Sequence, residues 1–327
     1  MEIGKVPNDV LEKIVFSNIK NKRKEVLIEA GIGKDCAVID YGEYACIVST
    51  DPITGASKNL GSLAINVSCN DIASSGAEPI GALMTILIPP SATEEDLECI
   101  MRQAGEEAEK LNIEIVGGHT EVTDAVNKII ISTTVIGKQL TDKVIDPKKV
   151  KLGDKIVITK TAGIEGTAII AHELYEELEG KISKELLEHA KTLSEKISVV
   201  KEGLIGGKIG ANYMHDITEG GVLGAIWEAS YATEKGVFVH KDLIPIERST
   251  FEISKVLNID PYRLISSGSM LMIVSDDNLN KLSTELKSED IDFAVIGEVV
   301  ESGITIEIDG EKSNIDPPGG DELYKVI

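Results

Sequence analysis

Apolar residues in the stretch from Leu60 to Ser75 recur with helical spacing until polar residues take over the same face. The recurring apolar positions are Leu60, Leu63, Ala64 and Val67. This i, i+3, i+4, i+7 pattern predicts a helix with one buried side. At about 100° per residue, Asn70, Asp71 and Ser74 continue the apolar stripe, so an amide and a carboxylate point where the pattern requires Leu or Val.

The carboxylate of Asp71 needs a partner if this face is buried, because an ionised group is costly to leave unpaired away from water. A metal ion, a cation or backbone N–H groups are the usual partners. A second interpretation is that the helix ends near Asn70, where Asn70 and Asp71 cap it or begin a turn. The stretch by itself leaves both interpretations open.

The first half of the chain contains two further helical patterns and several strand patterns. Residues 8–20 predict an amphipathic helix, and its expected buried face is Val10, Leu11, Ile14 and Val15. Thr93, followed by three acidic residues, predicts the start of a helix that continues to about Leu111. Strands are predicted over residues 37–39, 44–48, 80–88, 113–116 and 128–137.

Polar groups directly follow two of these strands. Ser49-Thr50-Asp51-Pro52 comes after the strand at 44–48, and Pro52 is expected to close that strand just after the carboxylate. Gly117-Gly118-His119-Thr120-Glu121 follows the strand at 113–116. Two glycines allow a close backbone approach to a ligand, and the next three residues offer a donor, a hydroxyl and a carboxylate. Taken alone, His119 is better explained as a surface-loop histidine.

A glycine-rich segment, Gly31 to Ala37, leads into the strand at 37–39. It is not a Walker A loop, because neither Ser nor Thr follows Gly33-Lys34 and no strand precedes it. It is not a dinucleotide fingerprint, because a strand rather than a helix follows. Either the segment is a lid that carries Lys34 and Asp35 over a ligand, or it is an ordinary turn.

The second half of the chain begins within the polar connection from Thr141 to Val150, which predicts domains at 1–145 and 146–327. A strand at 156–159 leads into a glycine-rich turn that opens a helix; such turns can hold a phosphate, although many hold nothing. Asp216, Thr218 and Glu219 precede paired glycines at another helix start, which repeats the chemistry of the first half. Further predictions are a helical region at 183–203, a helix through Trp227, a helix from about Asn278, a strand at 293–299 and a polar tail.

Length and charge narrow the classes of partner. The 327 residues exceed what one core usually serves, which predicts two domains. The net charge of −22 makes nucleic acid and anionic membrane surfaces poor partners. An acidic protein can bind an anionic small molecule if a cation lies between them, and Mg²⁺ is the simplest choice.

Two sequence features concern the cellular compartment. The N-terminus has no signal-peptide core and no run approaches about 18 apolar residues, so we expect a soluble, cytoplasmic protein. The four cysteines fit neither a metal spacing nor a small disulfide framework, and we expect reduced core thiols.

Five short motifs follow one another along nearly the whole chain. They are Gly31-x-Gly33-x-Asp35-x-Ala37, Ser49-Thr50-Asp51, Asn70-Asp71-Ile72 with Gly76-Ala77-x-Pro79, Gly117-Gly118-His119-Thr120, and His215-Asp216-x-Thr218-x-Gly220-Gly221. In this order the chain resembles the aminoimidazole ribonucleotide (AIR) synthetase superfamily. Ser266-Ser267-Gly268-Ser269 and the Asp-x-Thr-x-Gly-Gly form look most like its hydrogenase-maturation carbamoyl dehydratase branch.

The resemblance implies a two-domain fold: an N-terminal α/β domain that pairs with a second copy into a dimer barrel, and a C-terminal α+β domain. It also implies that ATP and Mg²⁺ are held between the domains. The implied metal ligands are Asp35, Asp51 and Asp71. The implied nucleotide-binding residues are Gly33, Lys34, Asn70, Gly117, Gly118, His119 and Thr120. The implied catalytic residues are Asp71, Asp216 and Thr218.

The implied activity is Mg-ATP-dependent phosphorylation of an amide-type oxygen, or a similar nucleophile, of a small molecule or a partner protein. Clustered carboxylates agree with this, because phosphoryl transfer needs mainly positioning and charge stabilisation. The alternative is a nucleotide-binding assembly or regulatory protein without turnover.

Two further expectations concern the acceptor and the assembly. The carbamoyl dehydratases end in Pro-Arg-Ile-Cys, whose cysteine carries the substrate group, whereas this chain ends in Lys-Val-Ile, so we expect a separate acceptor. We also expect a homodimer, because the strands at 44–48, 80–88 and 128–137 are too apolar for a sheet left half exposed.

Overall fold

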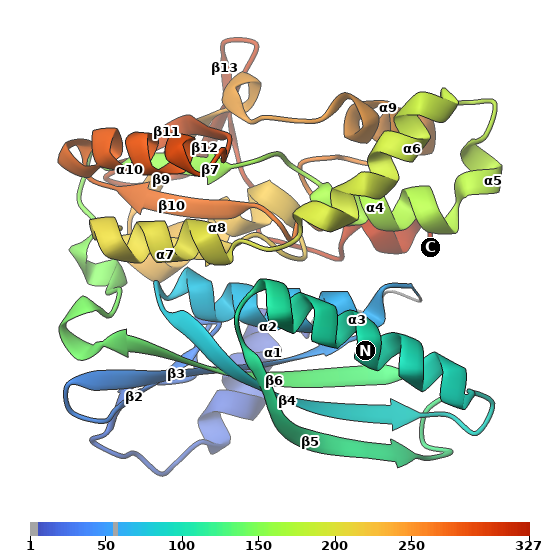
Figure 1. Cartoon of the computed structure of the whole chain (residues 1–327). Helices are drawn as coiled ribbons and strands as arrows, with labels where there is room; N and C mark the ends of the chain where they lie inside the picture. Colours follow the sequence, from blue (N-terminus) through green and yellow to red (C-terminus); the bar gives the residue numbers. More distant parts are fainter. Residues whose placement is uncertain (1–5, 55–57) are drawn as a thin grey trace.

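Two domains lie one above the other in the computed structural model, which describes residues 6–54 and 58–327 (Figure 1). A six-stranded sheet ends at Leu140, and a seven-stranded sheet begins at Lys155. The connection contains the short turns η3 (Thr141–Lys143) and η4 (Pro147–Lys149), and the predicted boundary at residue 145 falls within it. The first five residues of the stretch used to exclude a signal peptide lie outside the described residues.

The N-terminal sheet has the strand order β1-β2-β3-β6-β4-β5. Its strands are β1 (Val26–Ile28), β2 (Ala37–Asp40), β3 (Tyr44–Ile53), β4 (Glu78–Ile88), β5 (Glu114–Val122) and β6 (Ile130–Leu140). Only β4 and β5 pair in parallel, joined by a crossover helix. The helices α2 (Leu60–Ser74) and α3 (Glu94–Lys110) cover one face of the sheet (Figure 1). Thr93 caps α3 through a capping box, as predicted.

Helix α2 runs without interruption through Asn70 and Asp71, so the interpretation that these residues cap its end is wrong. Every residue of α2 except Ser62 is buried. The helix is buried all round because it contacts β3 and β6 on one side and α7 and β8 of the C-terminal domain on the other. Its polar residues therefore lie in the layer between the domains.

The C-terminal sheet has the order β13-β12-β9-β11-β7-β10-β8. Its strands are β7 (Lys155–Thr159), β8 (Tyr213–Asp216), β9 (Gly236–His240), β10 (Met270–Val274), β11 (Phe293–Val300), β12 (Ile304–Ile308) and β13 (Glu311–Asn314). Its helices are α4 (Ile164–Glu173), α5 (Tyr175–Leu178), α6 (Lys184–Thr192), α7 (Val200–Ile209), α8 (Gly221–Thr233), α9 (Arg248–Leu257) and α10 (Asp276–Ser288). Short turns are η5 (Leu193–Lys196), η6 (Lys241–Leu243) and η7 (Glu322–Lys325). Strand β8 is the edge strand that contacts α2, so its end faces the N-terminal domain.

Glycines allow α7 to lie directly against α2. A Cβ atom on Gly203 would lie 2.2 Å from the carbonyl oxygen of Ala73, and one on Gly207 would lie 2.6 Å from that of Gly76. Apolar side chains of both domains, Met214 among them, belong to one core cluster. The domains therefore share a core beside the cleft that separates them.

The amphipathic helix predicted over residues 8–20 is wrong in form and in burial. The segment consists of three short pieces, α1 (Asn8–Val10), the π-helical turn η1 (Leu11–Val15) and η2 (Phe16–Asn18). Ile14 and Val15 of the expected buried face are 58% and 46% exposed, since no described element of the chain covers them.

Two strands extend through residues that were expected to follow them. Strand β3 continues to Ile53, so Pro52 does not close it. Strand β2 pairs with β3 only as far as Val48, which leaves this edge of β3 open at Pro52, and proline is tolerated on an open edge. Strand β5 likewise continues through Gly117 and Gly118. A Cβ atom on Gly118 would lie 1.9 Å from the carbonyl oxygen of Met84, so this glycine permits strand pairing.

Two predictions for the C-terminal domain also need correction. The helical region at 183–203 is interrupted at residues 197–199, which separate η5 from α7. The polar tail contains the hairpin of β12 and β13 and the turn η7, whose Leu323 is buried. The strands β12 and β13 are short and rich in polar residues, so their hydrophobic pattern is too weak to predict them from the sequence.

The cysteines are free, and Cys36 and Cys69 are buried as expected. Cys99 lies exposed on α3, so the expectation of a core thiol is wrong there. Among residues 6–54 and 58–327, no helix combines the length and the apolar character that a membrane crossing requires.

Candidate functional site

Four aspartates from four separate elements border one cavity of about 850 Å³ between the domains. Asp35 precedes β2, Asp51 lies in β3, Asp71 lies on α2, and Asp216 ends β8. The cavity is within the size range of small-molecule sites. The predicted residues Gly33, Lys34 and Thr218 border the same cavity. Seven residues predicted from separate motifs thus meet at one place.

The glycine-rich segment before β2 forms part of the cavity wall. Gly33 has a φ of +68°, which a residue with a side chain adopts at a cost. The adjoining Lys34 brings a cation to the cavity, together with Lys128 from the turn before β6. This arrangement agrees with a segment that carries Lys34 and Asp35 over a ligand.

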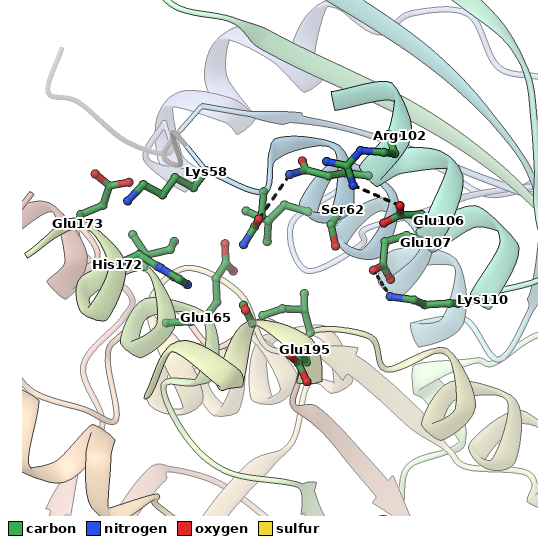
Figure 2. Close-up of a pocket in the computed structure, with 17 residues that line it drawn as sticks. Lys58, Ser62, Arg102, Glu106, Glu107, Lys110, Glu165, His172, Glu173 and Glu195 are labelled. Carbon is green, nitrogen blue, oxygen red and sulfur yellow. Dashed lines mark hydrogen bonds and ion pairs between the residues drawn. The ribbon is translucent and has the colours of Figure 1, made fainter. Parts of the chain in front are cut away.

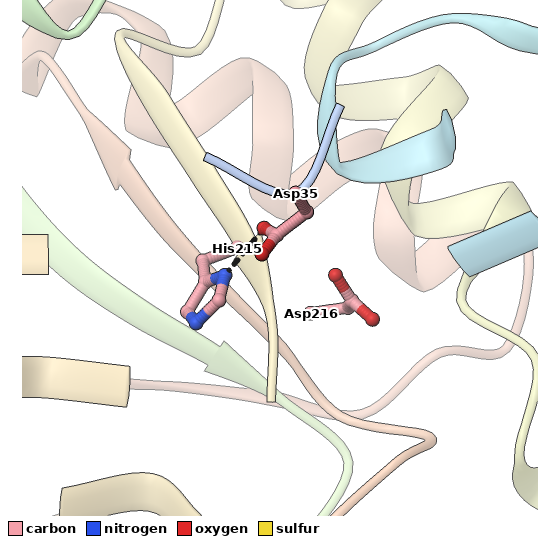
Figure 3. Close-up of side chains that lie close together, drawn as sticks. All are labelled: Asp35, His215 and Asp216. Atoms are coloured by element: carbon pink, nitrogen blue, oxygen red, sulfur yellow. Dashed lines mark hydrogen bonds and ion pairs between the residues drawn. The ribbon is translucent and has the colours of Figure 1, made fainter. Parts of the chain in front are cut away.

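His215 of the C-terminal domain contacts Asp35 of the N-terminal domain (Figure 3). Its Nδ1 lies 2.9 Å from an Asp35 carboxylate oxygen, and its Nε2 lies 2.9 Å from a Glu228 carboxylate oxygen. Burial lowers the pKa of His215, but Asp35 and then the other neighbours outweigh it, and the net shift is well above the usual value. The imidazolium therefore fixes the carboxylate of Asp35 beside Asp216.

Crowding of the aspartates disfavours their full ionisation. Burial raises the pKa of Asp71 well above its usual range, and the charges of Asp216, Asp51 and Asp35 raise it further. Ser49 donates a short hydrogen bond to Asp71. Burial, followed by the charge of Asp35, raises the pKa of Asp216 to about 7, although His215 opposes the rise. The cluster therefore attracts cations.

The donor set fits a hard divalent cation. Both carboxylate oxygens of Asp216 are buried and lack a hydrogen-bond partner among the described residues. One carboxylate oxygen of Asp35 and one of Asp216 lie within 4.8 Å of each other. With Asp51 and Asp71 on the same cavity, carboxylate oxygens predominate, and these are the ligands that Mg²⁺ prefers.

Asn70, expected at the nucleotide, lies outside the lining of this cavity. Its Nδ2 donates to the carbonyl of Ile197 at 2.8 Å, and its Oδ1 accepts from the Val199 N–H at 2.8 Å. Both halves of the amide therefore hold the segment before α7 in the C-terminal domain.

Gly117, Gly118, His119 and Thr120 also lie away from the cavity within one chain. They are exposed on β5, the edge strand of the N-terminal sheet. The His119 ring lies 3.0 Å from Glu121 on the same strand. None of these four residues lines the aspartate cavity of its own chain, and their contact with a nucleotide stays a prediction.

Sequence reasoning missed two carboxylates of the cleft. Glu228 is the only charged residue of α8, and a lone charge in an apolar helix is a usable signal. Glu165 lies in the glycine-rich turn that was given little weight as a phosphate site. Its side chain is buried and borders the aspartate cavity.

Two family models match most of the chain. Residues 33–139 match the family model of the AIR synthase related protein N-terminal domain, and residues 151–309 match that of the C-terminal domain. A putative hydrogenase expression/formation protein of Methanocaldococcus jannaschii is 27% identical over 99% of this chain and 97% of its own length. Carbamoyl dehydratase HypE of Escherichia coli is 26% identical over 84% of this chain and 81% of its own.

Solved structures share the two-domain fold. HypE in the HypE–HypF complex is similar with a TM-score of 0.73 and 26% identity, covering 94% of this chain and 99% of that chain. HypE in complex with ATP has a TM-score of 0.70 and 20% identity, covering 98% and 97%. The fold resembles the AIR-synthetase type that the sequence motifs imply.

Proposed function

The chain belongs to the AIR synthase related proteins, a superfamily of ATP-dependent enzymes, and we propose that it transfers the γ-phosphoryl group of Mg-ATP to an acceptor oxygen. The convergence of Asp35, Asp51, Asp71 and Asp216 on one interdomain cavity carries the proposal. Such an acidic cavity can hold a triphosphate only with divalent cations between the charges.

Asp35, Asp51 and Asp71 would hold the metal, which when bound neutralises phosphate charge. His215 keeps Asp35 in place through its 2.9 Å contact, and Ser49 does the same for Asp71. Lys34 and Lys128 add positive charge on the cavity wall.

Asp216 and Thr218 lie where the phosphoryl group and the acceptor would meet. The transfer breaks the bond between the γ-phosphorus and the bridging oxygen, which leaves with ADP, and forms a bond to the acceptor oxygen. Thr218 supplies a hydroxyl donor at the wall. Asp216 supplies a carboxylate at the same wall.

The acceptor is proposed to be an amide-type oxygen or a similar nucleophile on a small molecule or a partner protein. Two of the similar proteins are named carbamoyl dehydratase, which supports an amide-type acceptor. A similar solved structure is a complex of HypE with HypF, which supports a protein partner.

A homodimer would complete the nucleotide site. Gly117 to Thr120 do not line the cavity of their own chain, and we propose that β5 of a second copy brings them to it. Asn70 then acts by holding the C-terminal domain in place rather than by touching the nucleotide.

Calorimetry and a turnover assay test the function together. ATP should bind with Mg²⁺ and bind far more weakly after chelation, and phosphate or ADP should be released when a suitable acceptor is added. Tight Mg-ATP binding without turnover across a panel of amides and carbamoylated compounds, with and without partner proteins, would favour the nucleotide-binding assembly protein. Equal ATP binding with and without Mg²⁺ would contradict the metal proposal.

A further inference from the structure

A second cavity of about 440 Å³ lies between the domains (Figure 2). Helices α2 and α3 form its upper wall in the figure, and α4 and η5 form the lower wall. Its apolar lining is Leu63, Ala168, Ile169 and Ile197. This volume can hold a small organic ligand. Glu165 and Ile169 also border the aspartate cavity, so the two spaces meet at these side chains.

The first turn of α4 fixes Glu165 at this junction. Gly163 caps the helix with a φ of +71°, and its N–H donates to the Ser266 hydroxyl at 2.9 Å. A Cβ atom on Gly166 would lie 2.4 Å from Leu264, so the turn lies directly on that segment. Figure 2 shows the Glu165 side chain pointing from α4 toward α2 and α3.

Glu165 is buried without a partner for one of its oxygens. The residue is only 7% exposed, and its Oε2 has no hydrogen-bond partner within the described part of the chain. Burial raises the pKa of Glu165 to about 7, although neighbouring Ser267 opposes the rise. A buried polar atom left unpaired destabilises the fold, which makes a ligand the natural partner for Oε2.

The charges of the wall indicate what kind of ligand fits. Five glutamates face three Lys or Arg residues around the cavity. Two of these glutamates, Glu106 and Glu107, are paired with Arg102 and Lys110 at 3.2 and 2.7 Å. Among the described lining residues, three glutamates and one lysine remain outside these two pairs. Burial, and then the charge of Lys58, lowers the pKa of His172, so that ring adds no charge at neutral pH. The cavity therefore favours a cation or N–H donors over an anion.

We infer that this second cavity binds a ligand bearing a cationic or N–H-rich group, such as an amidine, with Glu165 as the residue that positions it. Because Glu165 also borders the aspartate cavity, the ligand is the phosphoryl acceptor or carries it, a step that rests on the proposed function. Glu165 acts here by holding the ligand rather than by reacting.

Three compounds of one shape test the charge preference: benzamidine, benzamide and benzoate. Ligand-detected NMR titrations at physiological ionic strength should rank benzamidine first and benzoate last. Glu165→Gln should weaken benzamidine at least tenfold, because it replaces the anionic oxygen while keeping the shape. Ser62→Phe should also abolish binding by filling the cavity from the one residue of α2 that is not buried.

Glu98→Gln is the matched control, since Glu98 is an exposed residue of α3 that does not line the cavity, and it should leave benzamidine binding unchanged. Benzoate binding as tightly as benzamidine, no binding of any probe, or equal benzamidine affinity in Glu165→Gln and wild type would overturn the inference. Mg-ATP titrations of the same samples separate the two proposals. If the wild type binds Mg-ATP but does not prefer benzamidine, only the inference about the second cavity is rejected. If the wild type does not bind Mg-ATP, the proposed function is rejected.

Discussion

Asp71 combines burial, like charges and a fixed hydrogen bond at one carboxylate. Its raised pKa means that the folded protein accommodates the uncharged form more easily than the charged form until a cation is present. Ser49 donates a hydrogen bond to the same group. An amide of the same shape should therefore suit the fold and fail only at the metal.

Asp71→Asn and Asp51→Asn should each weaken Mg-ATP binding at least tenfold, because each removes an anionic oxygen ligand. The melting temperature of Asp71→Asn should not fall, since an amide keeps the shape of a carboxyl group whose charged form the fold disfavours. Calorimetric titration with and without Mg²⁺ measures the affinity, and Asp142→Asn, at an exposed position, is the control. Unaltered affinity in both variants would leave the polar face of α2 without a metal role.

Glu165 gives stability a dependence on pH whose sign can be worked out. Burial raises its pKa from 4.5 to about 7, so the folded chain binds this proton more tightly than the unfolded chain does. The free energy of unfolding of the wild type should fall by up to about 3 kcal/mol as pH rises from 4.5 through 7. Glu165→Gln should not show this fall.

Urea unfolding at pH 5 and pH 8 measures the effect. Relative to wild type, Glu165→Gln should be more stable at pH 8 than at pH 5, whereas Glu98→Gln should show no such difference. A constant offset between Glu165→Gln and wild type at the two pH values would show that Glu165 keeps its ordinary pKa in the folded protein.

At the scale of elements, α2 joins the domains through Asn70. The side chain is fully buried and satisfies one carbonyl and one N–H of residues 197–199. Lys160 holds the same segment by donating to the carbonyls of Ser198 and Gly268, and it pairs with Glu202 at 2.6 Å. A small polar network thus fixes the C-terminal domain on α2.

Asn70→Ala should destabilise the protein by about 2–4 kcal/mol, because it leaves two buried backbone groups unpaired and removes side-chain volume. Chemical unfolding gives the value, with Asn280→Ala on the exposed face of α10 as the control. A loss similar to that of the control would show that water or a local shift satisfies the segment.

The sequence predicted elements well where periodicity was long and poorly where tertiary context decided. The apolar stripe of α2, and Thr93 with the acidic residues that follow it at the start of α3, were sufficient to predict these two helices. The ends of β3 and β5 were not, because open sheet edges accept Pro52 and paired glycines that usually stop a strand. Glu228 was not predicted as a site residue, because its role depends on contact with His215, which only the fold brings close.

At the scale of the whole molecule, the N-terminal sheet exposes several large apolar side chains. Helices cover one face, and the other exposes large side chains that include Ile80 at 42%, Leu83 at 37% and Val116 at 53%. Apolar surface of this kind on a sheet marks an interface. The edge strand β5 also leaves unpaired backbone groups at the side of the same sheet.

A two-fold dimer through this sheet should cover the apolar face and bring β5 of each copy to the cavity of the other. Light scattering at micromolar concentration should give twice the 35.1 kDa of the chain. Leu83→Glu combined with Val116→Lys should yield monomers that keep their fold yet bind Mg-ATP at least tenfold more weakly. Leu152→Glu changes an exposed leucine outside the sheet, 58% against 37% for Leu83, and should alter neither property. A wild type of 35.1 kDa would exclude the dimer, and a monomeric double variant with unchanged Mg-ATP affinity would show that Gly117 to Thr120 of a second copy do not serve the nucleotide.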